Sequence, residues 1–281
     1  MFGYVPPVGR RPMVWAHAGA HRRLAAPSAA RLPRSRRDAG LPAAAAVTAP
    51  ARRTGRGLII DLDDTLYPRE RFVRSGLAAV AHHVGVHHGI ATERAYSLMA
   101  RASANGQAGT ELQALCDHFG LPSDIIPALV QVFRTHTPSL FLGRESVETL
   151  QRLRADGWAL AVLTNGMPSV QFRKVAALGV TSLVDEVIYA EEHAPGGKPA
   201  AAPFLAALRS LELEPAQCVC VGDDAARDVR GARALGMATI RLARPGQPVD
   251  AADEADAVID SVRQVPDVAR FLLTRVDAHV A

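Results

Sequence analysis

The sequence of 281 residues is poor in cysteine and has no long apolar run, and each shortage excludes a class of protein. The three cysteines, Cys116, Cys218 and Cys220, cannot all pair, and they show neither a disulfide framework nor a zinc-binding spacing. We therefore expect a protein of a reducing compartment. No run approaches the roughly 18 apolar residues of a membrane-spanning helix, so we expect no membrane partner. A hydrophobic content of 48% predicts a globular protein with a full core.

The first 57 residues lack lysine and almost lack acidic residues, because eleven arginines stand there against Asp38 alone. This segment carries a formal charge of +10, whereas the whole chain carries +4, so residues 58–281 carry −6. The high pI is therefore a property of the N-terminal segment. Because no aromatic stacking pattern accompanies these arginines, we expect no nucleic-acid partner.

Residues 1–56 are rich in Ala, Arg and Pro without a sustained period, and we predict a disordered tail. The tail has no continuous apolar segment of the secretory type. Three interpretations stay open: an organellar transit peptide, a solvated extension, or a start codon placed too early. The expected location is the cytoplasm, with organellar import by the tail as the alternative.

From residue 57 onward, short apolar runs alternate with helical patterns. Several runs, such as LAVLTN and CVCVGD, are continuously apolar, which is typical of parallel strands buried on both faces. The alternation predicts an α/β fold with an open, doubly wound, Rossmann-like parallel sheet. The predicted strands are Gly57–Asp63, Trp158–Thr164, Glu186–Ala190, Gln217–Gly222, Ala238–Leu242 and Ala257–Ile259. The predicted helices between and after them are Ser146–Asp156, Pro168–Leu178, Ala201–Leu211, Ala226–Leu235 and Ser261–Thr274.

One stretch interrupts this alternation. Between Leu66 and about Gly143 the apolar residues recur at helical spacing, and no strand is convincing. We predict three or four inserted helices that form a small separate domain over residues 67–143. Residues 57–66 and 144–281 then form the core domain.

Polar residues follow four of the predicted strands at the edge where an open α/β sheet binds its ligands. They are DLDDT at 61–65, TNG at 164–166, GGKP at 196–199 and GDDAARD at 222–228. Each alone has an ordinary interpretation, since aspartates cap helices and TNG forms turns. All four together, each at the end of an apolar strand, indicate a common site.

With these four motifs the chain resembles the haloacid dehalogenase (HAD) superfamily of phosphohydrolases, over about residues 57–245. DLDDT corresponds to the D-x-D-x-T motif, LTNG to the second motif, GGKP to the third and GDDAARD to the fourth. The helical insert corresponds to the C1 cap of that superfamily. The details are most similar to its small-metabolite phosphatases, including nucleotidase-like and sugar-phosphate phosphatase-like branches.

The resemblance implies a Mg²⁺-dependent phosphatase acting through an aspartyl-phosphate. Asp61 is then the nucleophile and a metal ligand. Asp63 protonates the leaving oxygen, later activates water, and gives its backbone carbonyl to the metal. Asp223 is the remaining metal ligand from a side chain.

The same resemblance assigns the phosphate-binding residues. Thr164 and Lys198 contact the phosphoryl group, and Lys198 also neutralises Asp61. Asn165 offers its backbone N–H to the phosphate. Asp228 orients Lys198 or a metal-bound water. Asp64 is expected to support the turn rather than the chemistry, and the pair Ala200-Ala201 replaces a helix cap rather than a catalytic group.

The expected partner is a small phosphorylated metabolite, and the protein is expected to be a monomer or a homodimer. Two alternatives stay open: a 2-haloacid dehalogenase-type hydrolase and a non-catalytic binding module. Asp63 argues against the dehalogenase, because dehalogenation needs no acid for an alkoxide leaving group. The arginines at 69, 71 and 74 and the histidines at 82, 83, 87 and 88 are candidates for choosing the substrate, although the histidines more often prove to be solvated or packed.

Overall fold

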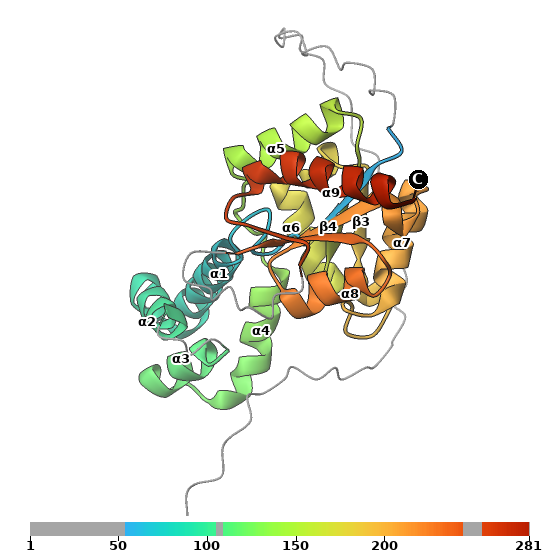
Figure 1. Cartoon of the computed structure of the whole chain (residues 1–281). Helices are drawn as coiled ribbons and strands as arrows, with labels where there is room; N and C mark the ends of the chain where they lie inside the picture. Colours follow the sequence, from blue (N-terminus) through green and yellow to red (C-terminus); the bar gives the residue numbers. More distant parts are fainter. Residues whose placement is uncertain (1–53, 105–108, 244–254, 281) are drawn as a thin grey trace, which may run out of the picture. The chain divides into compact units, whose positions relative to one another are not determined.

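The computed structural model describes residues 54–104, 109–243 and 255–280, and these contain a six-stranded, all-parallel sheet flanked by helices (Figure 1). The strand order β3-β2-β1-β4-β5-β6 confirms the predicted doubly wound α/β fold. All six predicted strands are present, with ends shifted by a few residues: β1 Gly57–Ile60, β2 Ala159–Thr164, β3 Glu186–Tyr189, β4 Cys218–Gly222, β5 Ala238–Leu242 and β6 Ala257–Ile259. The predicted disordered tail lies, up to residue 53, outside the described residues.

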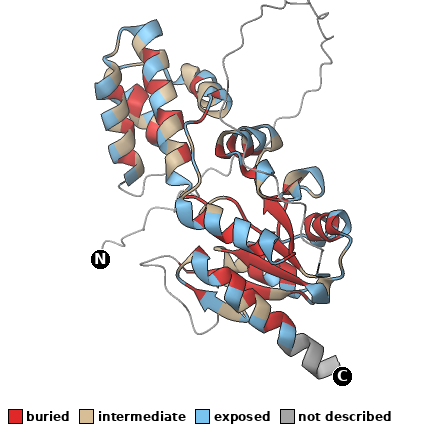
Figure 2. Cartoon of the chain, turned by 90° about the horizontal axis from the view of Figure 1, so that it is seen from above, coloured by how far each residue is buried: buried red, intermediate tan, exposed pale blue. Residues whose placement is uncertain are grey.

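Helices cover both faces of the sheet, and the side-chain alternation of the strands assigns each residue to one face. Leu58 and Ile60 of β1 pack with α5 (Arg144–Ala155), α6 (Pro168–Leu178) and α9 (Val265–Val280). Ile59 packs on the opposite face with α7 (Ala201–Leu211) and α8 (Arg230–Arg233). Every residue of β1, β2 and β4 is buried (Figure 2), and each fully buried Val, Leu or Ile contributes about 1.5–3 kcal/mol to stability.

Cys218 and Cys220 lie on the same face of β4, in the cluster that contains Ile59, because side chains two residues apart in a strand point the same way. Cys116 is buried in the helical insert, and all three thiols are free. The cysteines are therefore small core residues.

In the described residues, four α-helices lie between β1 and α5, where the insert was predicted. They are α1 Glu70–His88, α2 Thr92–Ala104, α3 Glu111–Phe119 and α4 Ile126–Thr135. Their apolar residues form a cluster of their own, which includes Leu77, Met99 and Leu129. Phe72, near the start of α1, belongs instead to the core cluster of the sheet. The boundary of a separate cap domain at residue 67 stays a prediction. No helix among the described residues has the length and apolar content needed to span a membrane.

Candidate active site

The site lies at the carboxyl ends of β1, β2 and β4. The strand order reverses at β1, which pairs with β2 on one side and β4 on the other, so this is the switch point at which open α/β sheets bind ligands. Ile60 is in register with Val162 and Val221, and the N–H of Asp61 donates to the carbonyl of Val221 at 2.9 Å. This register carries Asp61 and the Gly222-Asp223 pair to the same edge.

Lys198 reaches the centre of the site from the loop between β3 and α7. Its Nζ donates to Oδ1 of Asp61 at 2.6 Å, to Oδ1 of Asp228 at 2.7 Å and to the carbonyl of Leu163 at 2.8 Å. Burial lowers the pKa of this ammonium, but the two carboxylates more than offset the effect and hold the pKa above its ordinary value. Lys198 is therefore a fixed positive charge.

The carboxylates around Lys198 form an oxygen-rich group suited to a hard cation. Oxygens of Asp61, Asp223 and Asp228 lie within 4.8 Å of one another. Burial raises the pKa of Asp61 to about 7, Lys198 opposes the rise and Asp228 adds to it. One ammonium thus does not fully compensate the two buried carboxylates that share it. An all-oxygen donor set with uncompensated negative charge fits Mg²⁺.

The fourth motif departs from the predicted regular helix over Ala226–Leu235. A π-helical turn spans Ala225–Val229, and α8 follows it. Asp224 caps the turn, since its Oδ1 accepts from the N–H groups of Ala226 and Arg227. Oδ2 of Asp228 accepts from the N–H of Asp224 at 3.1 Å while Oδ1 faces Lys198. Turns of this kind often mark functional sites, and here the turn directs Asp228 inward.

Asn165 has a structural contact that its sequence position did not indicate. Its Oδ1 accepts from the N–H of Lys198 at 2.8 Å, and its Nδ2 donates to the carbonyls of Lys198 and Gly196. A Cβ on Gly197 would lie 2.5 Å from the same Oδ1, so the close approach requires glycine there. Asn165 of the second motif therefore fixes the loop that carries Lys198 of the third motif.

Asp63 lies in a second polar group, separate from the contacts of Lys198. Its Oδ1 accepts from the hydroxyl of Tyr67 at 2.6 Å, and Nζ of Lys174 contacts Oδ1 at 2.9 Å and Oδ2 at 2.7 Å. Gln171 donates to Oδ2 at 3.3 Å and accepts from Oγ1 of Thr164 at 3.1 Å. Sequence reasoning missed Lys174 and Gln171, because both look like ordinary positions of a helix. A signal for Lys174 existed, since lysine is rare in this chain.

Asp64 has the architectural role that the sequence suggested. It adopts a left-handed conformation with φ of 64°, and its Oδ1 accepts from the N–H of Arg69. Ala200 precedes α7 without a side-chain cap, as expected for the Ala-Ala pair.

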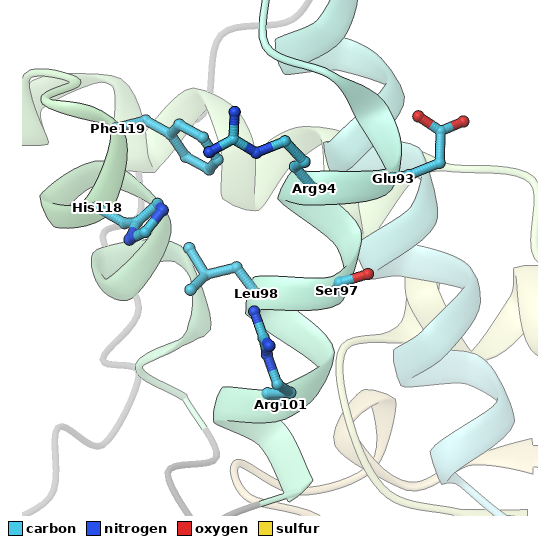
Figure 3. Close-up of a pocket in the computed structure, with 7 residues that line it drawn as sticks. All are labelled: Glu93, Arg94, Ser97, Leu98, Arg101, His118 and Phe119. Carbon is cyan, nitrogen blue, oxygen red and sulfur yellow. The ribbon is translucent and has the colours of Figure 1, made fainter.

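A hollow of about 420 Å³ lies on the insert between α2 and α3 (Figure 3). Arg94 extends toward the ring of Phe119 there, with its guanidinium carbon 5.8 Å from the ring centre. None of the predicted site residues lines this hollow, so it is not the place of the chemistry. Of the proposed substrate-selecting arginines, Arg74 pairs with Glu70, and Arg71 lies over the ring of Phe141.

Known sequences show what the chain is similar to. The sequence model described as haloacid dehalogenase-like hydrolase matches residues 56–236. The ribulose-1,5-bisphosphate 5-phosphatase of Halopiger xanaduensis is 31% identical over 216 residues, which cover 71% of this chain and 89% of the relative. The glyceraldehyde 3-phosphate phosphatase of Methanocaldococcus jannaschii is 29% identical over 226 residues, which cover 77% of this chain and 98% of the relative.

Solved structures show the same fold. The protein YfnB of Bacillus subtilis aligns with a TM-score of 0.58 at 17% identity, over 78% of this chain and 99% of its own. A 2-haloacid dehalogenase of Pseudomonas syringae pv. Tomato aligns with a TM-score of 0.54 at 28% identity, over 77% of this chain and 99% of its own.

Proposed function

The chain belongs to the haloacid dehalogenase-like hydrolase family, and we propose that it is a Mg²⁺-dependent phosphatase that hydrolyses small phosphomonoesters through an aspartyl-phosphate on Asp61. The resemblance to this superfamily that the four motifs indicated is confirmed by the family match. The broader assignment, a phosphoric monoester hydrolase, follows from the family together with the phosphatase relatives. The metal, the intermediate and the roles of individual residues are the proposal.

One observation carries the proposal: the Asp61 carboxylate lies at the switch point, 2.6 Å from Lys198 and close to Asp223 and Asp228. In the proposed reaction an oxygen of Asp61 attacks phosphorus, the bond from phosphorus to the leaving oxygen breaks, and Asp63 gives that oxygen a proton. The Asp63 carboxylate then takes a proton from water. The water oxygen attacks phosphorus, the bond to Asp61 breaks, and phosphate is released.

Charge neutralisation is the main requirement of phosphoryl transfer. Lys198 supplies one positive charge, and Thr164 with the backbone N–H of Asn165 would bind phosphoryl oxygens. Asp61, Asp223 and the carbonyl of Asp63 would hold Mg²⁺, which when bound neutralises further charge on the phosphoryl oxygens.

The test is phosphate release by the purified chain with Mg²⁺ from a panel of phosphomonoesters. The panel includes glyceraldehyde 3-phosphate, ribulose-1,5-bisphosphate, phosphoserine and phosphoglycolate, the substrates named for several relatives. We expect Mg²⁺-dependent turnover of at least one ester and its loss in Asp61→Asn. No release from any member, or full activity in Asp61→Asn, would overturn the proposal.

The dehalogenase alternative is tested in the same preparation. Release of halide from a 2-haloacid without metal, in the absence of phosphate release, would favour it. The presence of Asp63 favours phosphatase activity, because a halide leaving group needs no proton.

A further inference from the structure

Lys174 is the one basic side chain that contacts Asp63 in the described part of the site, and the proposed reaction gives it no role. Its Nζ lies 2.9 Å from Oδ1 and 2.7 Å from Oδ2 of Asp63, and the side chain is 4% exposed. Burying an ammonium is costly unless it is paired, so this contact is specific. The lysine comes from α6, a helix whose inner face packs in the core of the sheet.

The composition of the chain singles out the same residue. Of 32 lysines and arginines in the sequence, two are lysines: Lys174 and Lys198. Both are buried at the site, where Lys174 pairs with Asp63 and Lys198 pairs with Asp61, the two first-motif aspartates of the proposed chemistry. A lysine ammonium is compact and donates in several directions, whereas guanidinium is a larger planar fork. The two lysines therefore stand at the two buried positions where a cation contacts a carboxylate of the proposed chemistry, Asp63 or Asp61.

We propose that Lys174 is a positioning residue that holds the Asp63 carboxylate in its working orientation, together with Gln171 and Tyr67. This inference rests on the proposed function, because it assigns Lys174 a role through the acid and base of that reaction. Asp63 lies on the loop after β1, where the backbone alone does not fix a side chain. Tyr67 and Lys174 contact Oδ1, while Gln171 and Lys174 contact Oδ2, so rotation of the carboxylate breaks several contacts at once.

The same lysine also contacts the start of the helical insert. Its Nζ lies 4.5 Å from the centre of the Phe72 ring of α1, a cation–π contact. Gln171, one helical turn before Lys174, connects the Asp63 group to Thr164. The orientation of Asp63 is thereby tied to α6, to the phosphate-binding Thr164 and to the first helix of the insert. Proton transfer depends on this orientation, since a catalytic group must lie within hydrogen-bond reach of the atom it serves.

The experiment compares Lys174→Met with the wild type on two substrates that differ in their need for an acid. One is the alkyl phosphate of the panel that the wild type hydrolyses fastest, whose alkoxide needs a proton. The other is 4-nitrophenyl phosphate, whose leaving group departs without one, followed as the first-turnover release of nitrophenolate. We expect turnover of the alkyl phosphate to fall by roughly 10- to 100-fold, the range for loss of a hydrogen bond to a charged group. First-turnover release of nitrophenolate should change less than about 3-fold, because Asp61 and Lys198 are untouched.

A double-mutant cycle separates positioning from general damage. In the Asp63→Asn background, Lys174→Met should add less than about 2-fold to the loss of alkyl phosphate turnover, because the lysine acts through Asp63. The double variant also leaves no unpaired buried charge, so it keeps the test valid if Lys174→Met alone folds poorly. Arg173→Met, an exposed neighbour on the same helix, is the matched control and should leave both substrates unaffected.

Equal losses on both substrates, or a further large loss in the Asp63→Asn background, would overturn the role of Lys174 while leaving the proposed function intact. If the wild type hydrolysed no ester, the proposed phosphatase function itself would be overturned, and this result is distinguishable from the outcomes that concern Lys174 alone.

Discussion

Nζ of Lys198 lies 2.7 Å from Oδ1 of Asp228, and both side chains are buried. The same ammonium reaches Asp61 at 2.6 Å. The direction of the third-motif lysine is thus set by an aspartate of the fourth motif, which in the proposed reaction touches no phosphoryl oxygen.

Removing the charge of Asp228 should therefore slow the reaction without abolishing it. Asp228→Asn keeps the shape of the side chain and loses the charge that faces Lys198. We expect kcat to fall by about 10- to 100-fold, as for other residues that orient a catalytic group, with a smaller change in KM. Steady-state phosphate release measures both constants. Glu148→Gln, which removes a surface partner of Arg144, should behave as the wild type, and an unchanged kcat in Asp228→Asn would contradict this role.

Gly222 should not tolerate a side chain. A Cβ at this position would overlap the carboxylate of Asp228, which is buried and cannot swing into solvent. We expect Gly222→Ala to lower the free energy of unfolding by about 1–3 kcal/mol, as overpacking does, and to reduce phosphate release. Gly143→Ala is the control, because a Cβ there meets no atom within 4 Å. The measurements are the free energy of unfolding in urea and the rate of phosphate release for both variants. Wild-type values for Gly222→Ala would contradict the prediction, because they would show that the end of β4 accommodates a Cβ.

Mg²⁺ should stabilise the folded chain even in the absence of substrate. A ligand that binds the folded state alone adds stability by mass action, about 2.7 kcal/mol at a hundred times its Kd. We expect the midpoint of thermal unfolding to rise with Mg²⁺ in the wild type and to rise much less in Asp223→Asn. Asp267→Asn, a surface variant, should keep the full shift. A shift of the same size in Asp223→Asn would remove that residue from the proposed metal site.

Acid should destabilise the helical insert through His136. Burial lowers the pKa of this imidazole, which contacts the carbonyl of Phe133 through Nδ1 and the hydroxyl of Ser75 through Nε2. Below the ordinary value of 6.5 the unfolded chain binds a proton at this position that the folded chain resists. Stability should therefore be full above that pH and fall as the pH drops below it.

The measurement is urea unfolding of the wild type and His136→Gln at several pH values on both sides of 6.5. The loss of stability on acidification should be smaller in His136→Gln. His87→Gln, at an exposed position of α1, should lose as much as the wild type. Identical pH dependence in His136→Gln and the wild type would show that other groups cause the acid sensitivity.

Much of the fold could be predicted because its signals are local. The continuously apolar runs LAVLT and CVCVG are strands buried on both faces, and both appear where the pattern put them. The insert was predicted from helical spacing, and four helices lie there in the described residues. The π-helical turn at Ala225–Val229 was not predictable from the sequence. Asp224 caps this turn, and Asp228 within it forms an ion pair with Lys198, which is distant along the chain.

The sequence by itself determined the sheet, the place of the insert and the four motifs at the strand ends, because each rests on residues adjacent along the chain. Only the tertiary structure decided how the acidic residues are held. Lys174 and Asp63 are 111 positions apart, and Asn165 reaches Lys198 across 33. Such contacts depend on strand register and helix orientation, which no local pattern encodes. The first motif supplies Asp61 and Asp63, the two aspartates of the proposed chemistry, and the fold pairs each of them with one of the two lysines of the chain.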